Sequence, residues 1–206
     1  MENYVSIVKA LGCARIADLM QADAQRMFVT YEAPSAWYGF PPALVPIMSD
    51  GSLPKYVGIW RDWFGDRPDS FVDMFVSQDH HVTEIARTEA QFCDVLAARL
   101  ITIHDDVSEE VAEYSEVVGL KNLDAIDAVT LETGDDPMGY TALPSFAEQC
   151  PRESCYEGYD GTFPVGSPQA HHLAFEFETP FLASDFPWLD ENTDHRAAFA
   201  LALKEG

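Results

Sequence analysis

The chain has 206 residues and a formal net charge of −23 at pH 7, with 47% hydrophobic and 12% aromatic residues. This apolar content excludes a disordered acidic tail, because such tails lack the side chains that build a core. A charge of this sign repels nucleic acid and anionic membrane surfaces, so neither is an expected partner. The charge instead favours a basic protein or a cation.

The acidic residues are concentrated in the second half of the chain. The last 107 residues hold 22 Asp or Glu and four basic residues, whereas the first 99 hold 13 acids and eight bases. Two interpretations remain open at this point. The acids form a partner-binding surface, or they serve only to keep the protein soluble.

The sequence predicts a cytoplasmic protein. No apolar run reaches the roughly 18–20 residues that span a bilayer. The segment Met1–Tyr4 lacks the basic start of a secretory signal. The cysteines are too few and too scattered for a disulfide framework, which indicates a reducing compartment; they are Cys13, Cys93, Cys150 and Cys155.

Apolar residues at helical spacing predict an amphipathic helix over residues 5–28, which Gly12 weakens or splits in two. Residues 31–46 are rich in proline and aromatic side chains and are expected to form an irregular, packed connection. Alternation of period two then predicts four strands, over residues 44–48, 56–60, 70–76 and 82–86. Pro46 makes the first of these a short strand or a strand at a sheet edge, since proline cannot donate to a neighbouring strand.

A helix over residues 90–100 is predicted to close this unit. Thr88 and Gln91 have the spacing of a capping box, in which each side chain accepts a hydrogen bond from the other's backbone N–H. The fold class is therefore α+β, with a mostly antiparallel sheet of four or more strands over residues 43–100 packed against helices.

Residues 104–206 are predicted to extend this single domain, whose core covers residues 1–103. Asp105 or Asp106 is expected to cap an acidic helix over residues 108–118, which Gly119 ends. Further on, the pattern predicts a short helix, a long ordered loop, a strand and a last helix, over residues 123–131, 134–167, 173–177 and 190–204.

The residues that carry chemistry do not form a catalytic pattern. His80–His81 and His171–His172 are adjacent pairs, and adjacent side chains on a strand point to opposite faces. Cys150 and Cys155 lack the second pair of ligands that a zinc ribbon needs. Hydrolase and phosphate-loop motifs are missing from the sequence. We therefore predict no enzymatic activity, no cofactor and no bound metal.

The segment 60–64 combines two tryptophans with a basic residue. On a strand, Trp60 and Trp63 would face opposite sides, so one could lie in the core and the other at an exposed rim. Exposed Trp and Arg side chains dominate protein-binding hot spots. The alternative is that both tryptophans belong to the core.

Three segments resemble the SUKH superfamily: VPIMSDGS at residues 45–52, YVGIW at 56–60 and EIART at 84–88. The resemblance covers about residues 35–103 and implies a non-enzymatic α+β domain. The superfamily includes a yeast cell-wall-synthesis regulator and bacterial immunity proteins, which bind and neutralise toxins. The chain departs from the pattern at Leu53, where the family often has glycine, and the resemblance does not account for the acidic extension.

The first functional hypothesis is a bacterial immunity protein that binds a basic secreted toxin domain through an acidic surface. Its candidate partner-binding residues are Asp105, Asp106, Glu109, Glu110, Glu113, Glu116, Trp60 and Trp63. A second hypothesis is a small metal-assisted hydrolase that uses residues near His104–Asp106 or Asp135–Asp136. A third is a regulatory adaptor with the same fold and a different protein partner.

Overall fold

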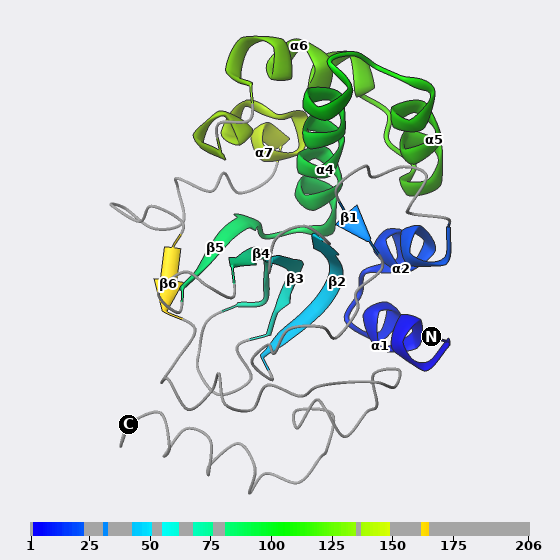
Figure 1. Ribbon diagram of the computed structural model, residues 1–206, viewed down its shortest axis with the longest axis vertical. Coiled ribbons are helices and arrows are strands. Elements are labelled where there is room, and N and C mark those ends of the chain that lie inside the picture. The colour runs from blue at the N-terminus through cyan, green and yellow to red at the C-terminus, as the bar shows by residue number, and fades with distance from the viewer. Residues whose placement is uncertain are drawn as a thin grey trace, which may run out of the picture.

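The computed structural model describes residues 2–22, 31–32, 43–50, 55–61, 68–75, 81–134, 137–148 and 162–164. These residues form an antiparallel sheet with a group of helices at one end of it and two further helices beside it (Figure 1). The α+β class predicted from the sequence is therefore confirmed. None of the helices in this part of the chain is both long and apolar enough to cross a membrane.

The sheet is a meander in which each strand pairs antiparallel with the next one along the chain. The four longer strands agree with the predicted ones to within two residues. In order, the strands are β1 (Tyr31–Glu32), β2 (Leu44–Asp50), β3 (Lys55–Trp60), β4 (Ser70–Phe75), β5 (His81–Ala86) and β6 (Thr162–Pro164).

The strand that contains Pro46 is longer than predicted. It pairs with β3 along its whole length, and the two-residue β1 joins its other side only at Ser49 and Asp50. The register between β2 and β3 shifts directly after Pro46. A bulge of this kind is one of the positions where a strand tolerates proline, which explains why the strand does not end there.

The predicted N-terminal helix is split, as its glycine indicated. Helix α1 (Glu2–Ala10) and helix α2 (Ala14–Gln21) are separated by a turn in which Gly12 has a φ of +81°. Glycine adopts such a left-handed conformation at no steric cost, because it has no Cβ. The turn lets both helices bury apolar residues, among them Val8 and Ile16.

Helix α4 (Glu89–His104) starts with the predicted capping box. Gln91 N–H donates to Thr88 Oγ1 at 3.2 Å, and Thr88 N–H donates to Gln91 Oε1 at 3.3 Å. Glu89 Oε1 also accepts a hydrogen bond of 3.0 Å from Ile16 N–H, so the first turn of α4 caps the first turn of α2. This contact joins two residues that lie 73 positions apart in sequence.

Helix α5 (Glu109–Val118) is capped by a residue other than the predicted one. Its N-cap is Ser108, whose hydroxyl accepts from Val111 N–H at 3.4 Å. Asp105 instead ends α4 in the left-handed conformation, and Asp106 Oδ1 accepts from Val107 N–H. The prediction that Asp105 or Asp106 caps α5 is wrong, because α4 runs four residues further than predicted and takes up Asp105 as its own end.

The next elements partly agree with prediction. Helix α6 (Leu123–Thr133) is confirmed. The stretch predicted as a long loop contains a 3-10 helix, η1 (Pro137–Ala142), then α7 (Pro144–Glu148) and β6. Elements of three to six residues are too short to show a period, which is why the pattern does not reveal them. The strand and helix predicted beyond residue 170 lie outside the described residues.

The core surrounds α4. Ten of the sixteen residues of α4 are buried. On its sheet side, Phe92 stacks on Phe71 of β4 with 4.3 Å between ring centroids. On its other sides, α4 contacts α2, α5, α6 and α7 (Figure 1). The strand residues Tyr56 and Trp60 are also buried, at 0% and 1% exposure.

Gly58 is the tightest point in the sheet, and its replacement provides a test of the strand register. A Cβ at this position would lie 2.3 Å from Val45 O, a backbone atom that cannot move without breaking the β2–β3 pairing. We expect Gly58→Ala to lower the free energy of unfolding by roughly 3 kcal/mol, measured by urea denaturation. Gly12→Ala is the control, because its Cβ would meet open space and only the φ is strained. The control should lower the free energy of unfolding by about 1–2 kcal/mol. Equal decreases in the two variants would contradict the register of β2 with β3.

Candidate functional site

The strongest surface feature of the described residues is acidic. Between positions 105 and 133 the chain has a single basic residue, Lys121, and none of its acidic residues is buried. These acids define what we call the acidic surface. They are Asp105, Asp106, Glu109, Glu110, Glu113, Glu116, Asp124, Asp127 and Glu132. The six acids predicted to bind a partner are thus all at least partly exposed, and α6 carries three further ones.

Helix α5 presents its acids outward because its other face is anchored. Val111, Tyr114 and Val118 are buried against the core. The Tyr114 hydroxyl donates a 2.9 Å hydrogen bond to the Cys93 carbonyl oxygen of α4, which fixes the rotation of α5 about its own axis. Glu109 and Glu116, seven positions apart, are both exposed on the side away from this anchor.

Several of these acids oppose the stability of the helices that carry them. Glu116 and Glu132 stand in the last turns of α5 and α6, where the negative end of the helix dipole disfavours a carboxylate. Glu109 and Glu113 are like charges four positions apart, an arrangement that costs about 0.2–0.5 kcal/mol. The dipole favours the acids in the first turns of these helices, Glu109, Glu110 and Asp124, so helix stability accounts for those three but not for Glu116 and Glu132.

Trp60 does not belong to this surface. Its side chain is 1% exposed and lies among core residues, so the prediction that it binds a partner is wrong for the chain in this conformation. The sheet buries both faces of β3, whereas the prediction assumed that one face is open. Trp63 and the pair Asp135–Asp136 lie outside the described residues.

A second cluster of charge is buried between the sheet and α4. Arg99 holds Asp73 with two hydrogen bonds, Nη1 to Oδ1 at 3.0 Å and Nη2 to Oδ2 at 2.7 Å, and Lys55 Nζ lies 3.1 Å from Asp73 Oδ2. Arg99 Nε also donates to the Tyr140 hydroxyl at 3.2 Å. Burial opposes ionisation of Asp73, but Arg99 and Lys55 outweigh it and lower its pKa. A carboxylate held in this way is a structural anchor and is poorly suited to proton transfer at neutral pH.

The described residues offer little nucleophilic or metal chemistry. Burial, the largest cause, raises the pKa of both Cys13 and Cys93 to about 12, so their thiols stay protonated at neutral pH. Within the described part of the chain, no three His, Cys, Asp or Glu side chains are grouped so that they could hold a metal ion.

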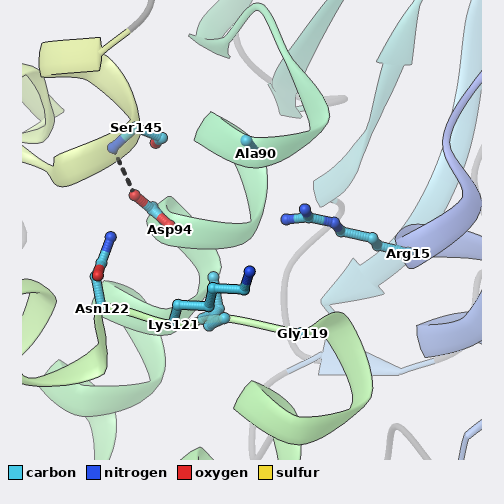
Figure 2. A pocket seen from close by; sticks show the side chains of 8 residues that line it. Arg15, Ala90, Asp94, Gly119, Lys121, Asn122 and Ser145 are labelled. Carbon is cyan, nitrogen blue, oxygen red and sulfur yellow. Dashed lines mark hydrogen bonds between the residues drawn. The ribbon is translucent and has the colours of Figure 1, made fainter.

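The structure also has a cavity that no sequence pattern indicates. It has a volume of about 230 Å³ and lies where α2, α4, the α5–α6 turn and α7 meet (Figure 2). Its lining residues are Arg15, Ala90, Asp94, Gly119, Leu120, Lys121, Asn122 and Ser145. They come from four separate stretches of the chain, so only the packing of the helices brings them together.

Comparison with known proteins finds no matching family model, no matching curated protein and no matching solved structure. The resemblance to the SUKH superfamily therefore stays a prediction.

The buried Asp73 cluster predicts a specific pH dependence. We expect Asp73→Asn to lower the free energy of unfolding at pH 7 by about 3–5 kcal/mol, because it removes the carboxylate that two buried cations share. The folded-state pKa of Asp73 lies below its ordinary value of 3.8, so its stabilisation is complete above that value and is lost as the pH falls through the lowered pKa. The stability of the variant should therefore change less than that of the wild type below about pH 4.

Urea denaturation from pH 7 down to pH 3 measures both effects. The control is Asp69→Asn, which removes an ion pair with Arg61 whose side chains are 37% and 42% exposed. An exposed pair of this kind contributes about 0–1 kcal/mol. Equal losses from the two variants at pH 7 would show that the Asp73 cluster does not anchor the fold.

Proposed function

We propose that this chain is a bacterial immunity protein, which binds a basic toxin domain through the acidic surface and thereby neutralises it. The proposal rests chiefly on one observation. Nine acids and one base occupy residues 105–133, and none of the nine is buried. When exposed residues of a folded domain carry charge of one sign, they accelerate association with a partner of opposite charge. They also disfavour partners of the same charge.

The placement of these charges supports binding over a purely local structural role. Glu116 and Glu132 stand where the helix dipole disfavours them, so their charge is retained at a small cost in helix stability. Burial and hydrogen bonding hold α5 against α4, so the carboxylates are displayed from a rigid element. A rigid display loses less conformational entropy on binding than a mobile one.

The order of elements supports the more specific part of the proposal. The resemblance implies a helix, a proline-bearing strand, an apolar strand with an aromatic residue, further strands and a closing helix introduced by Ser or Thr. The chain has these in α2, β2, β3, β4–β5 and α4, whose N-cap is Thr88. In bacteria, domains of this kind bind toxins that often act on nucleic acid, and such toxins are usually basic. An acidic partner surface is their electrostatic complement.

The direct test examines the gene immediately upstream, which on this proposal encodes a large secreted protein. Its C-terminal domain should be basic, should inhibit growth when expressed alone, and should be tolerated when this chain is expressed with it. Absence of such a neighbouring gene, or toxicity that co-expression leaves unchanged, would contradict the proposal.

The contribution of the acidic surface is measured with the variant E109Q/E110Q/E113Q/E116Q, whose fold is first checked by circular dichroism. At low salt we expect its association rate with the toxin domain to fall about tenfold, while its dissociation rate changes little, because the acids act mainly by long-range steering. Raising the salt to physiological strength, where the Debye length is about 8 Å, should reduce the difference.

A single-charge comparison controls for net charge. Glu116→Gln neutralises one exposed acid on the acidic surface, whereas Asp18→Asn neutralises one exposed acid on α2, outside it. If steering is local, Glu116→Gln should slow association more than Asp18→Asn. Equal effects of the two, or an unchanged rate in the fourfold variant, would mean that the acids serve solubility alone.

A further inference from the structure

The cavity between α2, α4, the α5–α6 turn and α7 concentrates positive charge on an otherwise acidic protein. Two of its lining residues are cations, Arg15 and Lys121, and one is an anion, Asp94, so the lining carries one net positive formal charge. Lys121 is also the single basic residue of positions 105–133. The base that interrupts the acidic surface is therefore one that lines this cavity.

Figure 2 shows how these side chains are arranged. Arg15 reaches from α2 towards α4, and Lys121 lies at the α5–α6 turn on the near side of the cavity. The Arg15 charge acts on α4 and α5, since it opposes the rise in pKa that burial causes at Cys93 and at Tyr114.

Ser145 places a buried hydroxyl, without a hydrogen-bond partner among the described residues, at the wall of the cavity. The residue is 8% exposed, and its Oγ is buried with no hydrogen-bond partner in the described part of the chain. Its backbone N–H donates to Asp94 Oδ2 at 2.9 Å, which fixes the start of α7 and leaves the hydroxyl end directed towards Ala90 (Figure 2). A buried hydroxyl without a partner costs about 1–3 kcal/mol, which a ligand oxygen would recover.

The start of α6 adds further donors. Asn122 is the N-cap of this eleven-residue helix but makes no side-chain capping bond, and its side chain points towards Asp94 and Ser145 (Figure 2). Cations, a hydroxyl and an amide together match the way proteins bind oxyanions.

We propose that this cavity binds a small oxyanion, a phosphate or carboxylate group of a metabolite. Arg15 and Lys121 compensate its charge, and Ser145 Oγ and the side-chain amide of Asn122 donate hydrogen bonds to its oxygens. One net positive charge suits a ligand with a single negative charge. Asp94 then accepts from Ser145 N–H and keeps α7 in place.

The test is titration of the full chain with inorganic phosphate, and separately with acetate, at constant ionic strength, followed by calorimetry and by NMR shifts. We expect saturable binding with a dissociation constant of about 1 mM or lower for at least one of the two anions. Stronger binding of phosphate would assign a phosphate ligand, and stronger binding of acetate a carboxylate. Absence of saturable binding by both anions would overturn the proposal.

Variants locate the binding. Arg15→Gln and Lys121→Gln should each weaken it about tenfold, as loss of a charge-assisted hydrogen bond predicts. Lys9→Gln, which changes an exposed cation outside the cavity, is the control and should have no effect. Equal binding by all three variants and the wild type would show that the anion binds elsewhere and would contradict the proposal.

Ser145→Ala distinguishes a ligand site from a cavity that holds only water. Because the hydroxyl has no protein partner, its removal should leave the free energy of unfolding unchanged or slightly higher, while anion binding weakens several-fold. A loss of stability with unchanged anion binding would mean that water satisfies Ser145, and the proposal would fail. The fourfold Glu→Gln variant of α5 should keep anion binding, so this test and that of the toxin-binding proposal can fail independently.

Discussion

The structure depends on the enclosure of α4. This helix is apolar nearly all round, with ten buried residues out of sixteen, and a helix of this kind is stable only if other elements cover every side. The sheet covers one side through the Phe71–Phe92 stack, and α2, α5, α6 and α7 cover the rest. Two polar groups at these contacts are paired: Asp73 with Arg99, and the Cys93 carbonyl oxygen with Tyr114.

The acidic surface follows from that enclosure. Helices α5 and α6 each need only one apolar face to cover α4, so the opposite face is free to carry charge. The same packing leaves a cavity at the junction of four elements, and the cations lining it are Arg15 and Lys121. The molecule has a net charge of −23, yet the lining of this cavity carries two cations and one anion.

Local patterns in the sequence predicted most of the elements but none of the long-range contacts. The strands of β2–β5, the capping box of α4 and the split at Gly12 follow from alternation, spacing and backbone freedom, which act within a few residues. The cap of α5 was misassigned because Asp105 and Ser108 are both good N-caps, and only the length of α4 decides between them. The Asp73–Arg99 pair joins residues 26 positions apart, and the cavity is lined by four separate stretches of the chain; no local period encodes either.

Hydrogen–deuterium exchange tests most directly whether the acidic surface binds the partner. Exchange is measured for the chain alone and in complex with the proposed basic partner. If the partner binds the acidic surface, amide exchange should slow within residues 105–133, most of all along α5. The exchange rates of β2–β5 should stay nearly unchanged. Protection confined to residues outside 105–133 would show that the partner binds another surface and would contradict the account.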